Sequence, residues 1–547
     1  MSRKGRKLLN AKKFSLLKSY NFSYNFLVET KSKVFLVFTV DMPMQYLVSL
    51  AVIVRKDFVI SIDFSLMNRI VGFLIIAVLG GWFSSCQKEH ISSSPSLKLS
   101  FSTDTLLFDT VFTTVGSATR SFKVYNRNRS DISISSVRLA GGSSSDYRLN
   151  IDGEATNHAS DILLRGKDSL FVFVEVTVDP TSENAPMLIP DSVVFETNGN
   201  IQDVKLVSWG QDVHLFNADT ILTNTTFMAD KPYLIYNYLW IYPNVELAIE
   251  PGAKLHFHNQ AQLIVSGSIK VNGGFENPVT FEGDRLEPFY RDKAGQWGGI
   301  WLTAGSHSNE IDWAEIKNGI IGLIVDTVGV EGEPTLVISN SKVENMSAAG
   351  LYARGAEIEA SNCLFGNASQ ISVALTMGGR YRFYHCTIAN YWAQYINRTG
   401  PALLLNNYYT YTPEGSSTEM LETRDLEEAY FGNCIVYGSR QEEFQLDNVY
   451  NGQPVDAQMN YFFESSVVRV GQDINIDDET HFLQVTSDNP LFVDPYEYDY
   501  RLDAESPAIN VGLLDIAIQY PFDLNNVSRT SDAGPDIGAY EWIQEEE

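Results

Sequence analysis

The chain is poor in cysteine and in basic residues. It holds 4 cysteines among 547 residues, too few for a disulfide framework in a chain of this length. Lysine and arginine number 40 against 67 aspartates and glutamates, a formal net charge of -27. This balance argues against a nucleic-acid partner, because phosphate backbones are bound by basic patches. Glycine and proline, at 38 and 19 residues, are too few for a low-complexity or collagen-like chain.

Long apolar runs are also absent, but a short one lies in the setting of an export signal. Arg69 precedes the apolar run Ile70–Leu79, and small residues then lead to Cys86. This order predicts a signal peptide over 67–85. Ser84 and Ser85 before Cys86 resemble a bacterial lipobox, which implies that Cys86 carries the lipid. The alternative is a transmembrane anchor, for which the run is too short and lacks a stop-transfer pattern.

Residues 1–66 do not read as a folded domain. They are rich in lysine and arginine, and their apolar stretch Val34–Val54 is interrupted by Asp41 and Pro43. We interpret 1–66 as an upstream extension from a mis-assigned gene start, with Met67 as the initiator. The alternative is a genuine membrane segment at the N-terminus.

The mature chain is expected to reach the outer membrane through its acyl anchor. Residues 1–85 hold 12 of the 40 basic and 4 of the 67 acidic residues, so the remaining chain has a formal charge of -35 and no basic patch to assist membrane binding. The triplet Gln87-Lys88-Glu89 resembles the export signal of Bacteroidetes-type surface lipoproteins. That resemblance implies a lipid-anchored protein exposed on the cell surface.

Two domains with different sequence patterns, at 97–212 and 213–547, follow a serine-rich tether at 86–96. Over 97–212, short β-branched and aromatic runs such as Ser121–Tyr125 and Leu170–Val178 alternate with turn clusters. About seven strands at this spacing predict an Ig-like β-sandwich. Over 213–547, apolar-x-apolar triplets such as Leu247/Ile249 recur between turn residues, which indicates a β-solenoid.

An internal repeat supports the solenoid. A small residue, an apolar residue two positions later and an asparagine two positions after that recur at steps of 27, 22 and 23 residues; a last copy, 48 residues on, lacks the asparagine. A step of 22–23 residues suits one turn of a three-sided coil. We predict that the small residues stack in the interior and that the asparagines stack at a corner, where their amides bond the backbone of adjacent turns. These residues are Ala314, Ser341, Cys363, Cys386 and Cys434, with Asn318, Asn345, Asn367 and Asn390.

The C-terminal segment carries the most specific resemblance. Asn489–Pro495, Tyr500–Leu502, Ser506–Asn510 and Asp536–Glu541 follow one another in an order similar to that of right-handed parallel β-helix proteins of the pectate-lyase-like superfamily, in which this run closes the coil. Asn510 stands where an aspartate is usual. The resemblance implies an all-β chain with an Ig-like sandwich followed by a right-handed parallel β-helix, and it does not fix the chemistry.

Candidate catalytic groups are scattered. Lyases of this fold use a cation to neutralise a uronate and a basic side chain to take its proton; the candidates are Arg354, Arg380, Arg382, Arg398 and His385. No carboxylate cluster with a paired cation accompanies them, so exposed surface charges are the alternative. Cys386 and His385 are neighbours, but alternation along a strand points them to opposite faces. We therefore expect the thiols to be buried as small apolar side chains.

No metal or other cofactor is predicted. The chain has no C-x-x-C pair for zinc. The acidic runs Asn475–Glu479 and Asp494–Asp503 offer oxygen ligands for calcium, yet neither matches a defined loop motif, and solvated turns are the alternative.

Aromatic residues gather around an insertion at about 407–430 that interrupts the repeat. Exposed aromatic side chains on a rigid scaffold offer stacking surfaces for sugars; the alternative is that they pad the coil beneath the insertion. The candidates are Tyr391, Trp392, Tyr395, Tyr408 and Tyr409. We hypothesise a non-catalytic surface lipoprotein that binds a polysaccharide or another surface ligand. The alternatives are a β-helix polysaccharide lyase or glycoside hydrolase acting on an acidic polysaccharide, and a purely structural spacer.

Overall fold

The computed structural model describes residues 22–30, 33–40, 50–55, 91–113, 115–180, 184, 186–326, 333–393 and 397–544. The chain divides into two compact units, Met1–His90 and Ile91–Glu547. In the first, β1 (Phe22–Thr30), β2 (Lys33–Val40) and β3 (Leu50–Arg55) pair antiparallel. The predicted signal peptide and Cys86 lie outside the described residues. Among the described residues, no helix is long and apolar enough to span a membrane.

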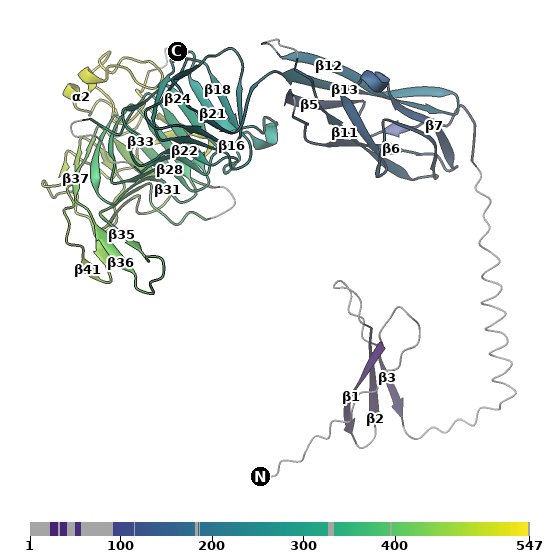
Figure 1. Ribbon diagram of the computed structural model, residues 1–547. Helices are drawn as coiled ribbons and strands as arrows, with labels where there is room; N and C mark the ends of the chain where they lie inside the picture. Colours follow the sequence, from purple (N-terminus) through teal and green to yellow (C-terminus); the bar gives the residue numbers. More distant parts are fainter. Residues whose placement is uncertain are drawn as a thin grey trace. The chain divides into compact units, whose positions relative to one another are not determined.

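The second unit begins with a β-sandwich of two five-stranded sheets (Figure 1). Its strands alternate buried and exposed residues, as β11 does, because each sheet has one inner face. In order across the first sheet, the strands are β10 (His158–Leu164), β7 (Ile132–Leu139), β12 (Met187–Thr197), β13 (Asn200–Gln211) and β5 (Thr105–Phe112). In order across the second, they are β4 (Ser100–Phe101), β6 (Arg120–Tyr125), β11 (Ser169–Val176), β8 (Tyr147–Ile151) and β9 (Glu154–Ala155). The short helix η1 (Gly142–Ser144) follows β7.

From β14 onward the chain winds into a parallel β-helix with three faces, as predicted. The first face stacks β14 (His214–Ile221), β16 (Tyr233–Ile241), β19 (Gln262–Val265), β22 (Gly299–Leu302), β25 (Ile321–Val325), β28 (Ala349–Arg354), β31 (Ile371–Thr376), β34 (Leu403–Asn406) and β39 (Phe444–Asp447). The second stacks β15 (Thr225–Phe227), β17 (Glu246–Ile249), β20 (Ser268–Asn272), β23 (Asn309–Asp312), β26 (Leu336–Ser339), β29 (Glu357–Ser361), β32 (Gly379–Tyr384), β37 (Leu426–Gly432), β42 (Phe462–Glu464) and β44 (Phe482–Leu483). The third stacks β18 (Lys254–Phe257), β21 (Val279–Gly283), β24 (Ala314–Lys317), β27 (Lys342–Met346), β30 (Leu364–Ala368), β33 (Thr387–Asn390), β38 (Ile435–Gly438) and β43 (Val467–Val468).

The predicted stacking of the repeat is confirmed. Strands of the third face pair in a register that places the small residue of one coil over that of the next. These small side chains are all buried, and the thiols of Cys363 and Cys386 donate to backbone carbonyls two residues back, at 3.2 and 3.4 Å. They therefore pack as small apolar groups, and burial raises the pKa of Cys363. The set also includes Ser466, whose Oγ accepts the Cys434 N–H at 3.0 Å.

The asparagines form two corner ladders instead of one. Asn318, Asn345 and Asn367 have positive φ and buried side chains that stack at one corner, as predicted. The Asn345 amide donates to Asn318 Oδ1, a side-chain acceptor instead of the predicted backbone one. Asn390 is also buried, and its amide donates to the Ala368 carbonyl of the preceding coil at 2.9 Å, the backbone bond that was predicted. A second ladder, which the sequence reasoning missed, occupies the residue directly before each small residue. Its members share a left-handed backbone that asparagine tolerates well: Trp313, Asn340, Asn362, His385, Asn433 and Ser465.

Aromatic rings stack inside the later coils. On the second face, Phe383, Phe431, Phe463 and Phe482 lie in register. Their ring centroids are 5.1, 4.6 and 5.6 Å apart, with interplanar angles of 22° or less. Beyond the last coil, partly buried residues such as Ile474 and Val485 pack against this core. The stack therefore extends the hydrophobic core to that end of the helix.

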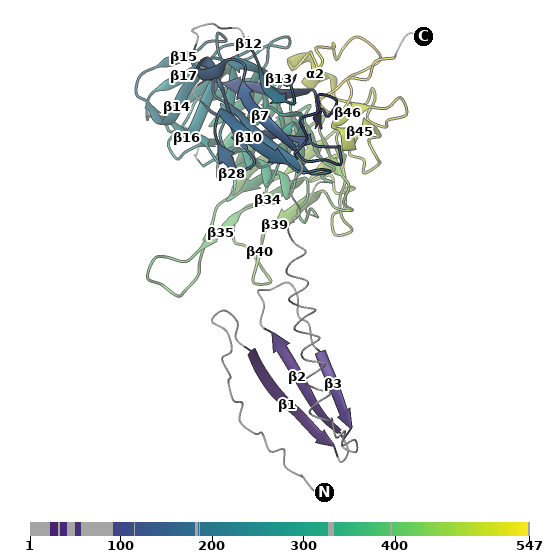
Figure 2. The same cartoon turned by 90° about the vertical axis from the view of Figure 1, so that its right-hand side faces the viewer.

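The C-terminal segment does not close the end of the coil, contrary to expectation. Residues 489–542, here called the C-terminal strap, lie along the third face (yellow in Figure 2). The strap bonds successive coils: Tyr498 Oη donates to Asn345, Arg529 to Asn362, the Ala539 N–H to Thr387 and the Leu513 N–H to Asn433. Its elements are β45 (Phe492–Asp494), η3 (Pro495–Glu497), β46 (Asp499–Leu502) and α2 (Leu514–Gln519).

The motif residues of the strap have structural partners. Asp536 accepts the N–H groups of Asn510 and Trp542 at 2.7 and 2.6 Å, and the buried pair of Arg529 and Glu541 lies at 2.6 Å. Strap residues cover Leu364, Ala389 and Ile435 on the outer surface of the third face. That cover explains why β30, β33 and β38 are buried on both sides.

A carboxyl group beneath the strap makes stability depend on pH. Burial raises the pKa of Glu344 to about 7 from an ordinary 4.5, and its Oε1 has no hydrogen-bond partner. The folded protein therefore favours the protonated acid. The stability that the raised pKa of Glu344 contributes is fully present below pH 4.5 and is lost as the pH rises through 7. Glutamine is neutral at every pH, so Glu344→Gln removes this pH dependence. The change that the substitution makes in the free energy of unfolding should be about 2 to 3 kcal/mol more favourable to folding at pH 8 than at pH 4.5.

The measurement is guanidinium denaturation at both pH values. Glu505→Gln, on the exposed surface of the same strap, is the matched control and should leave the pH dependence unchanged. Equal effects of Glu344→Gln at pH 4.5 and pH 8 would contradict the prediction.

Candidate functional site

Over five successive coils, the outer surface of the first face carries a row of apolar side chains, one from each coil. Strand register aligns Trp240 with Ile264, Ile264 with Trp301, Trp301 with Ile324, and Ile324 with Tyr352. Each is the central residue of an inward-outward-inward triplet, and each remains partly exposed. Within these five coils, aromatic rings occur on every second coil. The three rings, Trp240, Trp301 and Tyr352, are here called the aromatic row. The stacked strands that position it are labelled β16, β22 and β28 in Figure 1.

A row of polar groups runs beside the aromatic row. Trp240 Nε1 donates to Ser266 Oγ at 2.9 Å, and Trp301 Nε1 donates to Asp326 Oδ2 at 2.7 Å. Arg354 Nε donates to Asp326 Oδ1 at 2.6 Å, and this bond raises the pKa of Arg354. These bonds fix the edge of each indole toward the polar row. The face thus combines ring surfaces with adjacent donors and acceptors, a pairing suited to ligands that have both apolar and hydroxyl faces.

A hairpin borders this face. β35 (Tyr408–Tyr411) and β36 (Met420–Thr423) lie within the predicted insertion and project from the coils (Figures 1 and 2). Tyr409 and Tyr411 are 40% and 38% exposed, and their rings stack at 5.6 Å. Tyr408 instead donates its hydroxyl to Asp447 at 2.8 Å. The residues Leu426–Gly432, assigned to the insertion from sequence, already form β37 of the second face. A second hairpin joins β40 (Val449–Tyr450) to β41 (Gln453–Pro454).

The other aromatic candidates lie elsewhere or outside the described residues. Tyr391 packs against Phe492, Tyr496 and Tyr500 of the strap. Trp392, the next residue, bonds its N–H to Asn390 Oδ1 at 3.2 Å. Tyr395 lies outside the described residues. The five candidates therefore do not form one surface: Tyr408 and Tyr409 belong to the hairpin, and Tyr391 belongs to the strap contact.

The basic candidates do not converge on a substrate. Arg354 lies on the first face, whereas Arg380 and Arg382 lie on the second. Each is paired with a carboxylate: Arg354 with Asp326, Arg380 with Glu427 and Arg382 with Glu428. These three residues therefore do not form a shared basic site, because their charges are already neutralised by partners on neighbouring strands.

The remaining two candidates are internal. Arg398 forms a buried ion pair with Glu443, with Nη1 at 2.6 Å from Oε2. His385 is fully buried in a corner ladder, where its Nε2 lies 3.0 Å from Asn433 Nδ2. Burial lowers the pKa of His385 well below its ordinary value. Neither side chain reaches a substrate in this arrangement.

The acidic runs show local contacts in place of a cation site. Asp478 accepts the Thr480 hydroxyl at 2.6 Å, and Asp499 is paired with Arg501. Within the described parts of the chain, no group of three or more histidine, cysteine, aspartate or glutamate side chains is arranged to hold a metal ion.

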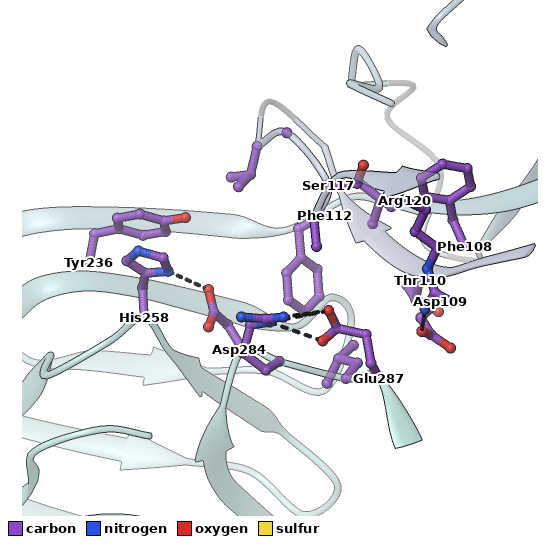
Figure 3. Close-up of a pocket in the computed structure, with 16 residues that line it drawn as sticks. Phe108, Asp109, Thr110, Phe112, Ser117, Arg120, Tyr236, His258, Asp284 and Glu287 are labelled. Carbon is purple, nitrogen blue, oxygen red and sulfur yellow. Dashed lines mark hydrogen bonds and ion pairs between the residues drawn. The ribbon is translucent and has the colours of Figure 1, made fainter. Parts of the chain in front are cut away.

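A pocket of about 270 Å³ lies where the sandwich meets the first coils. Figure 3 shows the His258 ring between Tyr236 and Asp284. The Tyr236 and His258 rings stack at 4.1 Å, and His258 Nδ1 lies 2.7 Å from Asp284 Oδ2. From the sandwich, Phe108, Phe112 and Arg120 line the opposite wall. Phe112 is buried by its contact with the His256 ring, 5.1 Å away.

The charges of this pocket are paired within each of its walls. Arg120 lies 2.6 Å from Asp109, and Arg285 binds Glu287 at 2.8 Å, next to η2 (Pro288–Tyr290). Burial is the largest single influence and would raise the pKa of Glu287. The hydrogen bonds from Arg285, a backbone hydrogen bond and the charges of Arg285 and Arg120 together outweigh burial, so the pKa is lowered. Glu287 is therefore ionised at neutral pH and unsuited to act as a general acid.

Comparisons with known proteins give no family. No protein-family model matches the chain, and no curated protein matches it. A family 123 glycoside hydrolase from Clostridium perfringens is similar over 22% of this chain and 30% of its own length, at 7% identity and a TM-score of 0.16. The chaperone DraB of E. coli is similar over 21% and 55%, at 10% identity and a TM-score of 0.16. The catalytic domain of a GH87 alpha-1,3-glucanase is similar over 64% and 84%, at 10% identity and a TM-score of 0.15. Likenesses this weak carry no argument about function.

The sequence reasoning missed the aromatic row, although a signal for it is present. The triplets Leu239-Trp240-Ile241, Ile300-Trp301-Leu302 and Leu351-Tyr352-Ala353 each place an aromatic residue between two inward-facing apolar residues. In a strand whose outer surface faces water, a polar residue is the ordinary occupant of that middle position. Tryptophan or tyrosine at that position leaves an aromatic ring on the outer face, and this departure from the ordinary pattern is the signal for the row.

Proposed function

We propose that the protein is a lipid-anchored protein of the outer-membrane surface whose β-helix, of the pectate-lyase-like type, binds a glycan without catalysis. The aromatic row is the observation that carries the proposal. Rings held on a rigid sheet beside hydrogen-bonding groups match the two-sided character of sugars, whose C–H faces stack on aromatic rings while their hydroxyls bond at the edge. The predicted lipid at Cys86 would hold this surface at the cell exterior.

The pairing of charges supports binding over catalysis. Elimination from a uronide needs a free cation and a base converging on one sugar, whereas Arg354, Arg380 and Arg382 are committed to separate carboxylates. The observation that favours the enzymatic alternative is the pocket at His258, which brings an imidazole and a carboxylate within 2.7 Å.

We expect glycan binding to depend on the aromatic row. In a glycan screen of the purified full chain, the combined substitution of Trp240, Trp301 and Tyr352 by alanine should weaken binding to any glycan retained by the unaltered chain by about a hundredfold or more, because each stacking contact contributes on the order of 1 kcal/mol. The side chains point out of the coil, so circular dichroism should show an intact fold. Affinity electrophoresis gives the ratio of affinities.

The matched control is Tyr496→Ala, which removes an aromatic side chain that is 58% exposed on the strap. It should bind as the unaltered chain does. Retention of affinity by the triple variant would overturn the proposal for this face, and release of unsaturated uronides or reducing sugars by the unaltered chain would favour the enzymatic alternative. The lipid anchor has its own test. In cells that express the full chain, Cys86→Ala should move the protein from the membrane fraction to the soluble fraction.

A further inference from the structure

The spacing of the aromatic row points to the shape of its ligand. We propose that the first face binds a neutral, extended, β-linked polysaccharide that lies parallel to the axis of the β-helix and is held at every second sugar. This inference rests on the proposed function and adds the class and orientation of the glycan. The register of Trp240, Trp301 and Tyr352 carries it.

The three rings are separated by two coils each. Ile264 lies between Trp240 and Trp301, and Ile324 lies between Trp301 and Tyr352. Neighbouring parallel strands lie about 4.8 Å apart, so consecutive rings of the row are about 9.6 Å apart. In an extended β-1,4-linked chain, successive sugars are flipped by half a turn, so every second sugar presents the same face. The length of that two-sugar repeat is close to the separation of two coils.

The intervening side chains fit the same geometry. Ile264 and Ile324 are partly exposed and smaller than the rings beside them, so they leave room for the sugar whose face is turned away. A helical α-linked glucan curves away from a straight row and would reach at most one or two of the three rings. The row therefore selects a straight chain over a curved one.

The charges of the face favour a neutral ligand. Asp326 and Arg354, which lie beside the row, neutralise one another, so no free cation is presented to a uronate by this pair. The mature chain, with its formal charge of -35 derived above from the sequence, repels polyanions as a whole. Thr303 Oγ1 lies 2.8 Å from Ser266 Oγ, so Thr303 belongs to the same polar row. Sugar hydroxyl groups can bond along this edge to Ser266, Thr303 and Asp326.

The number of rings predicts the length of chain that the face accommodates. Three platforms at two-sugar intervals are filled by a chain of about five sugars. The experiment is calorimetric titration of the full chain with cello-, manno- and xylo-oligosaccharides of two to six sugars, with malto-oligosaccharides of the same lengths and oligogalacturonates as comparison ligands. For at least one β-linked series, we expect affinity to rise about tenfold for each added platform and to level off at about five sugars.

A single substitution sharpens the test. Tyr352→Ala removes the terminal platform, so affinity should level off at about three sugars, while disaccharide binding should stay unchanged. Tyr496→Ala should leave the whole length profile as it was. Affinity that is independent of length, or equal affinity for malto-oligosaccharides or oligogalacturonates, would overturn this inference and leave the proposed function standing. If the aromatic row bound no glycan of any class, both would fall.

Discussion

Replacing Phe431 by alanine should lower the free energy of unfolding by about 3 to 5 kcal/mol, the range for deleting a fully buried phenylalanine. Phe431 is completely buried between Phe383 and Phe463, at ring separations of 5.1 and 4.6 Å. Its loss opens a cavity in the middle of a stack, where coils held by backbone ladders above and below cannot collapse to fill it. Guanidinium denaturation followed by tryptophan fluorescence measures the change.

The control for this substitution is Phe289→Ala. Phe289 is 69% exposed, so its removal should change stability by no more than about 0.5 kcal/mol. A loss below about 1 kcal/mol for Phe431→Ala would mean that the coils close around the gap, and it would contradict a rigid stack.

Replacing Arg398 by alanine should cost about 3 to 5 kcal/mol, because it leaves a buried carboxylate without its counter-charge. Glu443 is fully buried, accepts two bonds from Arg398 and also accepts the Arg440 N–H at 2.8 Å. The second substitution, Glu443→Gln, should recover a large part of the loss in the Arg398→Ala background, since it removes the stranded charge. The unaltered chain, the two single variants and the double variant form a double-mutant cycle, and thermal and guanidinium denaturation measure the stability of each.

The cycle separates charge from packing. If the double variant is as unstable as Arg398→Ala alone, the loss comes from the space that the arginine filled. If Arg398→Ala is nearly as stable as the unaltered chain, the pair is hydrated, and the buried ion pair described above is wrong.

The interior of the β-helix was readable from the sequence because one coil of chain returns to the same place. Cys363 and Cys386 are 23 residues apart in the sequence and adjacent in the structure. Positions that stack in the structure have the same space to fill in each coil, so similar residues recur in the sequence at intervals of one coil. Burial, register and the ladder at Asn318, Asn345 and Asn367 followed from that repeat.

The aromatic row was not readable in the same way. Trp240, Trp301 and Tyr352 are separated by loops of unequal length, including the excursion that contains η2, so no fixed step connects them. Strand pairing, and not sequence spacing, brings them into one line. The basic candidates lie apart for a related reason. Arg354 and Arg380 are near one another in the sequence, but a corner places them on different faces.

The course of the strap depended on a clue that a motif alone does not contain. Leu364, Ala389 and Ile435 point outward from the third face, yet they are apolar. An uncovered strand would carry polar residues at those positions. The apolar outer surface indicates that another segment covers it, and the only way to identify that segment was to see where residues 489–542 lie.

The strap should also make the unfolding of the β-helix more cooperative. A solenoid without such a segment interacts only between nearest neighbours, so it can fray coil by coil from a free end. Here Arg529 bonds Asn362 across 167 positions of the chain, and Tyr498 bonds Asn345 across 153. These hydrogen bonds connect the middle coils to the last part of the chain. Amide hydrogen exchange across the coils of β27, β30, β33 and β38 should therefore report one shared opening rather than a gradient of protection.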